Sequence, residues 1–329
     1  MYSHHSHSLD YVAHGVDHLE SVVARANHMH FELFCLTEHM PRISAQLLYP
    51  EEATGNAESD LETLRNSFEK FLVHAAQIKK RNLSTKIIIG MEVEGCDLSH
   101  IAYAKDLMEE NKRVIQFCIG SIHHVNGIPI DFDRSGWDRA LKSAGNNLRS
   151  LLRDYFEQQY ELIRELKPLV LGHFDLFRLF CTDDLYIDAE TGEKVEKLSS
   201  TSVRASEASF PALWDDIKGL ALRNLEAVAS YGGLIEINTS GLRKNLRDPY
   251  PHRDFATLAQ SVAGTRFVLS DDAHGVAHVG VCYDKALAYM SNILNLERLH
   301  YLTDVAGVLE VQSKSLEKIR QSSFWEQYL

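Results

Sequence analysis

The chain has 329 residues and a formal net charge of −12, with 34 Lys and Arg against 46 Asp and Glu. Its 45% hydrophobic and 24% charged residues are ordinary for a globular protein and exclude a disordered or fibrous chain. The acidic balance argues against a nonspecific nucleic-acid binder, although it permits a local basic pocket for a small anion. The unusual count is histidine, with 17 in all and eight within the first 39 residues.

The cysteines and the first residues of the chain indicate the cellular compartment in which the protein is expected. The five cysteines are far apart and form no CxxC motif, which is typical of reduced thiols in a cytosolic protein. The segment Met1–His5 has neither the basic nor the apolar region of a signal peptide, and no apolar run approaches the ~20 residues that span a bilayer. We therefore expect a cytoplasmic protein without membrane contact.

Short apolar segments alternate with longer amphipathic segments along the chain. Expected strands, rich in Ile, Val, Leu or Phe and typical of strands buried on both faces, are Met1–His5, Phe31–Thr37, Lys86–Glu92, Val114–Ser121, Leu169–His173, Gly233–Asn238 and Arg266–Ser270. Helical periodicity marks Ser59–Arg81, Trp137–Leu166 and Pro211–Tyr231. Asp17 and Ser59 each precede a glutamate by three positions, which predicts capping boxes that open two helices.

The alternation of strand and helix predicts an α/β fold with parallel strands joined by right-handed crossovers. Seven such units favour a closed or nearly closed barrel, and an open doubly wound sheet is the structural alternative. No linker rich in Pro, Gly or Ser divides the sequence, so residues 1–329 are expected to form a single domain. Pro41–Gly55 is expected to be a long loop and Cys181–Ser209 a surface insertion.

Imidazole and carboxylate side chains follow six of the seven expected strands. They are His5, His7, Glu38, His39, Glu92, Glu94, His123, His124, His173, Asp175, Asp271, Asp272 and His274. The carboxyl ends of the strands of a barrel converge on one face, where active sites are built. Imidazole and carboxylate are ligands of zinc, iron and manganese, and the lack of cysteine at these positions argues against a structural Cys site. We therefore expect a metal centre on this face.

Two short motifs have the spacing needed to hold one ion. In His5-Ser-His7 the residues i and i+2 of an extended chain point to one side, and Asp272-Ala-His274 repeats that spacing. The candidate ligands outnumber what one ion can use, so two or three metals are favoured. Closely spaced metals suit in-line displacement at phosphorus, because they generate hydroxide near neutral pH and neutralise charged oxygens.

Seven motifs together resemble the polymerase and histidinol phosphatase (PHP) family of metal-dependent phosphoesterases. They are His5-Ser-His7-Ser8, His14-Gly15, Thr37-Glu38-His39, Gly90-Met-Glu92-Val-Glu94, Gly120-Ser-Ile-His123, Gly172-His173-Phe-Asp175-Leu176 and Ser270-Asp-Asp272-Ala-His274. The stretch from Glu236 to Lys244, followed by Pro249-Tyr250-Pro251, is similar to the histidinol-phosphatase branch of the family.

The resemblance implies a distorted (β/α)7 barrel with three divalent metal ions, Zn, Fe or Mn. It implies a first metal held by His5, His7, Glu92 and Asp272; a second, bridged by Glu92, with His123 and His173; and a third with His14, His39 and His274. Three of these positions have a neighbour that could serve instead, namely His124 for His123, Asp271 for Asp272 and His18 for His14. Glu94 and Asp175 are candidates for orienting the histidine ligands.

The activity that the resemblance implies is hydrolysis of L-histidinol phosphate to L-histidinol and phosphate, in histidine biosynthesis. Arg178, Arg243 and Lys244 follow the fifth and sixth expected strands, and guanidinium groups match phosphate oxygens. Catalytic roles are expected for Glu92, Asp272, Arg178 and Arg243, and substrate binding for Arg178, Asn238, Arg243 and Lys244. Asn238 has an equally good alternative reading as a turn-capping residue. The expected partner is a small phosphate ester, with no nucleic acid and no membrane.

Three alternatives remain open on the sequence. Another PHP-family phosphoesterase would act on a different small ester or a nucleic-acid end, and a polymer substrate would need a basic groove that a charge of −12 does not suggest. An amidohydrolase barrel also opens with HxH, but it would usually place a bridging lysine at the end of a middle strand. A metal-dependent regulatory relative would keep the ligands and lack turnover.

Overall fold

Seven parallel strands form the centre of the computed structural model, which describes residues 1–328. In sheet order they are β1 (Tyr2–Ser3), β2 (Leu33–Leu36), β3 (Lys86–Glu94), β4 (Phe117–Ser121), β7 (Val170–Leu171), β11 (Leu234–Asn238) and β12 (Phe267–Ser270). A parallel bridge between Ser6 and Ala273 joins the two edges, with the His7 N–H donating to the Ala273 carbonyl at 2.7 Å. The sheet is therefore a nearly closed barrel, and all seven strands lie where the sequence predicts them.

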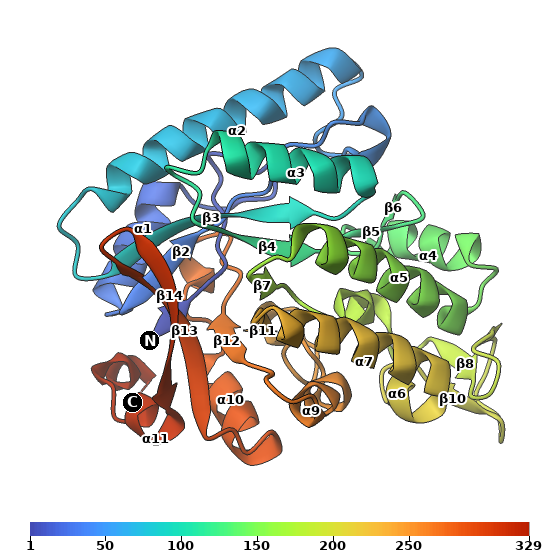
Figure 1. Cartoon of the computed structure of the whole chain (residues 1–329). Coiled ribbons are helices and arrows are strands. Elements are labelled where there is room, and N and C mark those ends of the chain that lie inside the picture. Colours follow the sequence, from blue (N-terminus) through green and yellow to red (C-terminus); the bar gives the residue numbers. More distant parts are fainter. Residues whose placement is uncertain (329) are drawn as a thin grey trace.

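Helices surround this barrel, as Figure 1 shows. They are α1 (Leu19–His28), α2 (Ala57–Lys79), α3 (Leu98–Glu110), α4 (Arg134–Ser143), α5 (Leu148–Leu166), α6 (Phe210–Leu213), α7 (Asp215–Ser230), α8 (Ser240–Arg243), α9 (Arg253–Ser261), α10 (Tyr283–Ala288) and α11 (Leu316–Arg320). The expected helix over Trp137–Leu166 is two helices, α4 and α5, separated by Gly145 and Asn146, which both have positive φ. None of the helices within residues 1–328 is long and apolar enough to cross a membrane.

The strand β3 shows how alternation sorts side chains between two cores. Ile87 and Ile89 belong to the large core shared with the helices, whereas Ile88 belongs to a small core made mostly of strand residues. A Cβ at Gly90 would lie 2.6 Å from the ring of Phe117, so glycine at this position lets that ring fill the barrel. The same inward row continues to Glu92, because successive strand residues face opposite sides. The inward-facing residues of β3 thus contribute Ile88 to the small core and the carboxylate of Glu92 to the cavity end of the barrel.

A two-stranded hairpin covers the end of the barrel at which the strands begin. Its strands are β13 (Arg298–Val305) and β14 (Val308–Ser315), which pair in antiparallel fashion. Tyr301 stacks on Tyr2 with ring centroids 4.1 Å apart, and the Leu302 N–H donates to His4 Nε2 at 3.2 Å. Leu302 completes the small core. The hairpin was not predicted from the sequence. Because it covers the amino-terminal end of the barrel, the accessible end is the one at which the strands finish.

Both predicted capping boxes are wrong, and in each case another side chain does the capping. The first turn of α1 is capped from a distance, because the Leu19 N–H donates to the Asp10 carboxylate at 2.8 Å. Asp17 instead accepts from the Val276 N–H at 2.8 Å. Helix α2 begins at Ala57, and its N-cap Asn56 accepts from the Ser59 N–H. Ser59 is therefore inside the first turn rather than at the cap.

The segment Cys181–Ser209 folds as a small antiparallel sheet with strand order β10-β8-β9. Its strands are β8 (Tyr186–Asp188), β9 (Lys194–Val195) and β10 (Ser202–Arg204). The buried side chain of Ile187 joins the large core. The Trp214 indole N–H donates to the Ala189 carbonyl at 2.9 Å, so the segment is attached to the helical layer. The long loop expected over Pro41–Gly55 contains one short 3-10 turn, Ala45–Leu47.

We predict that Asn56→Ala destabilises the fold by about 1 kcal/mol, because it removes the side-chain acceptor at the N-terminus of α2. Ser59→Ala is the matched control and should change the free energy of unfolding by less than about 0.5 kcal/mol. Chemical denaturation of both variants measures the difference. Equal losses for the two variants would contradict this assignment of the cap.

Candidate metal centre

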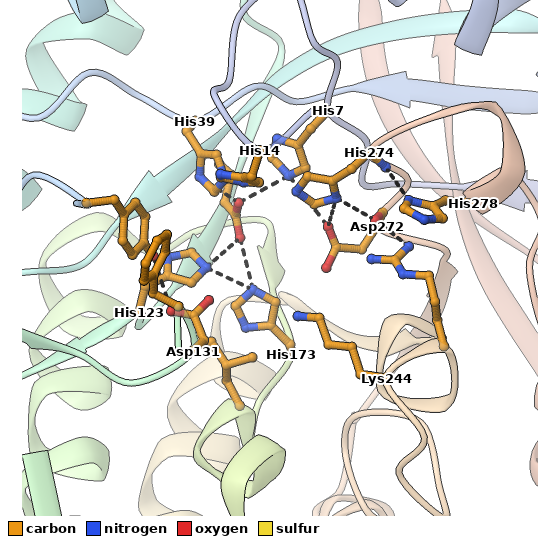
Figure 2. A pocket seen from close by; sticks show the side chains of 15 residues that line it. His7, His14, His39, His123, Asp131, His173, Lys244, Asp272, His274 and His278 are labelled. Atoms are coloured by element: carbon orange, nitrogen blue, oxygen red, sulfur yellow. Dashed lines mark hydrogen bonds and ion pairs between the residues drawn. The ribbon is translucent and has the colours of Figure 1, made fainter. Parts of the chain in front are cut away.

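A cavity of about 330 Å³ opens at the carboxyl ends of the barrel strands. It is lined by His7, His14, His39, Tyr49, Glu92, His123, Asp131, Phe132, His173, Leu176, Arg243, Lys244, Asp272, His274 and His278. Figure 2 shows the labelled imidazoles and Asp272 turned toward one another around this space. The structure therefore brings together side chains that lie up to 271 positions apart, from His7 to His278.

The carboxylate of Glu92 lies at the centre of the first group. Its Oε2 lies 3.2 Å from His5 Nε2 and 3.3 Å from His7 Nε2. Asp272 Oδ1 is 3.8 Å from the same nitrogen of His5 and 3.6 Å from that of His7. These four residues are the set expected for the first metal. Burial alone would raise the pKa of Glu92, but the surrounding imidazoles, His5 first, hold it well below its usual value.

The other oxygen of Glu92 faces a second group. Its Oε1 lies 3.0 Å from His173 Nε2 and 3.4 Å from His123 Nε2. The two imidazole nitrogens are themselves only 3.2 Å apart. Glu92 therefore has one oxygen directed at each pair of imidazoles, which is the arrangement needed for a carboxylate that bridges two cations.

A third group lies beside the first. The ligand atoms of His7, His39 and His274 all lie within 4.8 Å of one another. The ring of His14 is 5.4 Å from that of His39 and 4.9 Å from that of His274, centroid to centroid. His14 Nδ1 contacts Glu51 at 2.7 Å. All three histidines expected at a third metal thus meet at one place.

The donor atoms of these groups fit divalent metal ions. Among the candidate ligands, five buried imidazole nitrogens have no well-aligned hydrogen-bond partner within residues 1–328, namely His5 Nε2, His7 Nδ1, His7 Nε2, His39 Nδ1 and His173 Nδ1. Leaving such an atom unsatisfied costs about 1–3 kcal/mol, and several in one place need a common partner. A cation bound by imidazole and carboxylate would satisfy most of them. The face therefore carries several buried His and Glu clusters able to hold metal.

The structure distinguishes between the neighbouring residues that the sequence left open. His123, and not His124, faces the cavity, and burial lowers the pKa of His124 to about 4. Asp272 lines the cavity, whereas Asp271 accepts from the Ser3 hydroxyl at 2.8 Å and the Gly280 N–H at 2.7 Å. In the same way His14 lines the cavity and His18 is exposed, paired with Asp10.

Two carboxylates lie behind the histidines; Glu38 is among the candidates at the strand ends, whereas Glu236 was given no role from the sequence. Glu236 Oε1 lies 3.0 Å from His5 Nδ1, and its Oε2 accepts from the His173 N–H at 2.9 Å and from the Asn238 amide at 3.0 Å. Glu38 lies 3.5 Å from His7 Nδ1. Such partners fix the orientation of metal-binding imidazoles. The available signal was an acidic residue inside an apolar strand, Leu234–Asn238, where an unpaired charge is costly.

Glu94 orients two histidines, while Asp175 has a different partner. Glu94 lies 2.8 Å from His39 Nδ1 and 3.1 Å from His123 Nδ1, and it also pairs with Arg42 at 3.0 Å. Burial would raise the pKa of Glu94, but Arg42 and the imidazoles hold it well below its usual value. Asp175 pairs with Arg178 at 3.0 Å and contacts none of the cavity histidines through a described hydrogen bond.

Of the three cationic side chains expected to bind phosphate, two line the cavity and one does not. Arg243 and Lys244 line it, following β11 through the short helix α8. Arg178 is buried elsewhere, with its guanidinium between Asp175 and Asp254 and 4.4 Å from the ring of Phe210. The structure therefore does not bring Arg178 to the site, because two carboxylates and an aromatic ring already engage its charge.

Arg243 also supports the backbone of a candidate ligand. Asp272 has a φ of 50°, in the left-handed region that non-glycine residues seldom adopt. Arg243 Nη1 donates to the carbonyl oxygens of Asp271 at 3.2 Å and Asp272 at 3.0 Å. Asn238 lies buried beneath, with its amide 3.4 Å from the Asp272 carboxylate. Arg243 thus binds the backbone of this turn through Nη1, and its other guanidinium nitrogens remain available to a ligand in the cavity.

Comparisons with known proteins agree with this geometry. The PHP domain profile matches residues 3–240. The chain belongs to the PHP domain family. Its relatives include the histidinol-phosphatase of Saccharomyces cerevisiae, 47% identical over 335 aligned positions that cover 99% of each chain. A probable histidinol-phosphatase of Schizosaccharomyces pombe is 36% identical over 289 positions, covering 88% of this chain and 85% of the relative.

Two crystal structures have the same fold. The structure of hisK from Listeria monocytogenes matches with a TM-score of 0.67 at 20% identity, over 87% of this chain and 99% of that one. The histidinol phosphate phosphatase of Lactococcus lactis, complexed with zinc, L-histidinol and phosphate, matches with a TM-score of 0.52 at 17% identity, over 87% and 93%. The barrel predicted from the sequence is thereby confirmed as a PHP-type fold.

We predict that Glu236→Gln lowers metal affinity or phosphate release by about 10–100-fold, because an amide cannot accept hydrogen bonds on both of its terminal atoms. Glu226→Gln, on the exposed side of α7, is the matched control and should have no effect. Metal content after dialysis and initial rates measure both quantities. Wild-type metal content and rate in the Glu236 variant would contradict the orienting role.

Proposed function

We propose that this protein is a metal-dependent phosphomonoesterase that hydrolyses L-histidinol phosphate to L-histidinol and phosphate, in histidine biosynthesis. The observation that carries the proposal is the convergence of imidazoles and carboxylates on Glu92 inside a cavity that Arg243 and Lys244 also line. The full-length 47% identity to a histidinol-phosphatase supports the same substrate. A small phosphate ester fits a cavity of about 330 Å³.

The proposed metal content is three divalent ions per chain. The sets are His5, His7, Glu92 and Asp272; then Glu92, His123 and His173; and then His14, His39 and His274. Imidazole-rich sites suit zinc, iron and manganese. Bound in these sets, the ions would stabilise charge on the phosphoryl oxygens and supply a nucleophile from water near neutral pH.

The side chains of the protein would position the ester for this chemistry. Arg243 has one nitrogen bonded to backbone carbonyls, so its guanidinium is fixed before substrate binds. Its remaining N–H groups and the Lys244 ammonium would bind phosphate oxygens, in a geometry that a guanidinium matches well. Asp272 Oδ2 accepts from the Asn238 amide, which favours the ionised carboxylate. We propose that this carboxylate takes up the proton released by the attacking water and passes it to the leaving alkoxide.

The proposed setting is the cytoplasm, with a small-molecule substrate and no nucleic-acid or membrane partner. All five cysteines, which lie in the described part of the chain, are free thiols. The net charge of −12 supports a small substrate bound by a local cationic site over a polymer bound by an extended basic surface.

Phosphate release from L-histidinol phosphate tests the proposed function directly. We expect rapid release by the wild-type protein and a loss of more than ~100-fold in kcat/KM for His7→Ala and for Glu92→Gln, beyond the effect of an orienting residue. His28→Ala, an exposed histidine at the end of α1, is the matched control. Circular dichroism checks that each variant is folded.

The outcomes separate the parts of the proposal. Release from other phosphomonoesters with an inert L-histidinol phosphate would refute the substrate and keep the reaction class. A folded, metal-loaded protein inactive on every ester would indicate a regulatory relative. Elemental analysis of the same preparations gives the stoichiometry, and one ion per chain would refute the three-metal site.

Arg243→Ala should raise KM for the ester by about 30-fold, because loss of a partly buried charge partner costs about 2 kcal/mol. Arg243→Lys should recover only part of this, since an ammonium lacks the planar fork. Arg178→Lys should leave KM nearly unchanged if the folded protein is as stable as the wild type. Steady-state kinetics with competitive inhibition by phosphate measure the effect. An unchanged KM and phosphate affinity in Arg243→Ala would contradict the proposed binding of phosphate by Arg243.

A further inference from the structure

The cavity has two sides of opposite charge. Arg243 and Lys244 line one side, and Asp131 lines the other, beside His123. Figure 2 shows Asp131 and Lys244 on different sides of the space, with His173 between them. The chemistry assigned so far uses the cationic side and the histidines and leaves Asp131 without a role.

Asp131 is a carboxylate with no cationic partner in the described structure. Across residues 1–328 its one hydrogen bond comes from the Tyr49 hydroxyl, at 3.2 Å, and no Lys, Arg or His forms an ion pair with it. Carboxylates behind the cavity histidines do have such partners, for example Glu94 and Glu52, which both pair with Arg42. A carboxylate that faces a cavity unpaired is suited to receive a cation from a ligand.

Aromatic rings border this carboxylate. Tyr49 is 3% exposed, and its ring stacks against that of Phe132 with centroids 5.5 Å apart and an interplanar angle of 24°. Phe132 itself remains 37% exposed at the cavity. An exposed aromatic face beside a carboxylate attracts a cationic nitrogen and the flat ring that carries it.

The position of Asp131 is fixed before any ligand arrives. The Ile130 N–H, one residue before it, donates to the His123 carbonyl at 2.9 Å. Tyr49, its hydrogen-bond donor, is held in turn by the guanidinium of Arg42, 4.3 Å from the ring centroid. Because these contacts already order the loop, binding at Asp131 would require little further loss of conformational entropy.

We propose that Asp131, together with Tyr49 and Phe132, is the subsite for the cationic end of the substrate. This inference rests on the proposed function and deepens it, since L-histidinol phosphate carries a phosphate at one end and basic nitrogens at the other. The phosphate lies against Arg243 and Lys244, and an ammonium or protonated imidazole pairs with the Asp131 carboxylate. The two charged ends fix the orientation of the ester, so its phosphorus is presented to the histidine cluster.

Asp131 differs from the candidate metal ligands in its surroundings. None of the tight groups of ligand atoms among residues 1–328 includes it. Its predicted role is therefore in selecting the substrate, and its removal should change the preference between esters while leaving the metal content intact.

Asp131→Asn tests the inference, with Asp106→Asn on the exposed side of α3 as the matched control. The measured quantity is the ratio of kcat/KM for L-histidinol phosphate to kcat/KM for phenyl phosphate, which carries no cation. We expect Asp131→Asn to lower this ratio at least tenfold, mainly through KM, and Asp106→Asn to leave it unchanged. Tyr49→Phe should lower the ratio less, because it keeps the carboxylate.

Two further esters identify which nitrogen binds. If the ammonium group pairs with Asp131, the variant should also lose activity on 2-aminoethyl phosphate. If the imidazole does, the loss should appear with the imidazolylethyl ester that lacks the amino group. Either result supports the subsite.

An equal loss on cationic and uncharged esters, an unchanged ratio, or a fall in bound metal would each overturn the subsite. The proposed function is judged separately, on whether the wild-type protein hydrolyses L-histidinol phosphate at all. A wild-type protein that does so, with an unchanged ratio in the variant, would keep the function and refute the subsite.

Discussion

The buried carboxylate of Glu92 is the constraint on which the candidate site depends. An isolated charge of this kind is far too costly to bury, and it persists in a fold only with partners that compensate it. Here imidazoles from the ends of four strands, with His39 after β2 among them, surround both oxygens at 3.0 to 3.4 Å. Further carboxylates, Glu236, Glu38 and Glu94, lie behind those imidazoles. The alternation of imidazole and carboxylate thus extends outward in layers from one side chain.

The barrel fold brings these imidazoles and carboxylates together, although they are far apart in the sequence. Parallel strands deliver their ends to one face, and the residue after each strand needs only the correct type to join the cluster. Helices and the β13–β14 hairpin cover the remaining surfaces of the sheet. The apolar residues that form the two cores and the polar residues that form the site therefore belong to the same alternating strands.

Much of this could be predicted from the sequence, because local patterns determine it. Strand positions follow from short apolar runs, and the candidate ligands follow from residue type at strand ends, as with His5, His123 and Asp272. Features that depend on distant partners could not be predicted. Asp17 has the spacing of a cap, yet Asp10 occupies that place, and Arg178 has the charge of a phosphate ligand, yet Asp254 engages it. The roles of Glu236 and Asp131 depend on contacts with His5 and Tyr49, which are brought to them only by the fold.

The edge where the barrel closes has one further consequence. Strands β1 and β12 meet through the Ser6–Ala273 bridge, and the candidate ligands His5, His7, Asp272 and His274 flank that same bridge on both chain segments. Ions held in the proposed sets would therefore cross-link the first and last strands. Metal affinity and closure of the barrel would then be thermodynamically linked, since a ligand that binds only the closed form stabilises it. Loss of the ions would therefore weaken the contact between the first and last strands of the barrel.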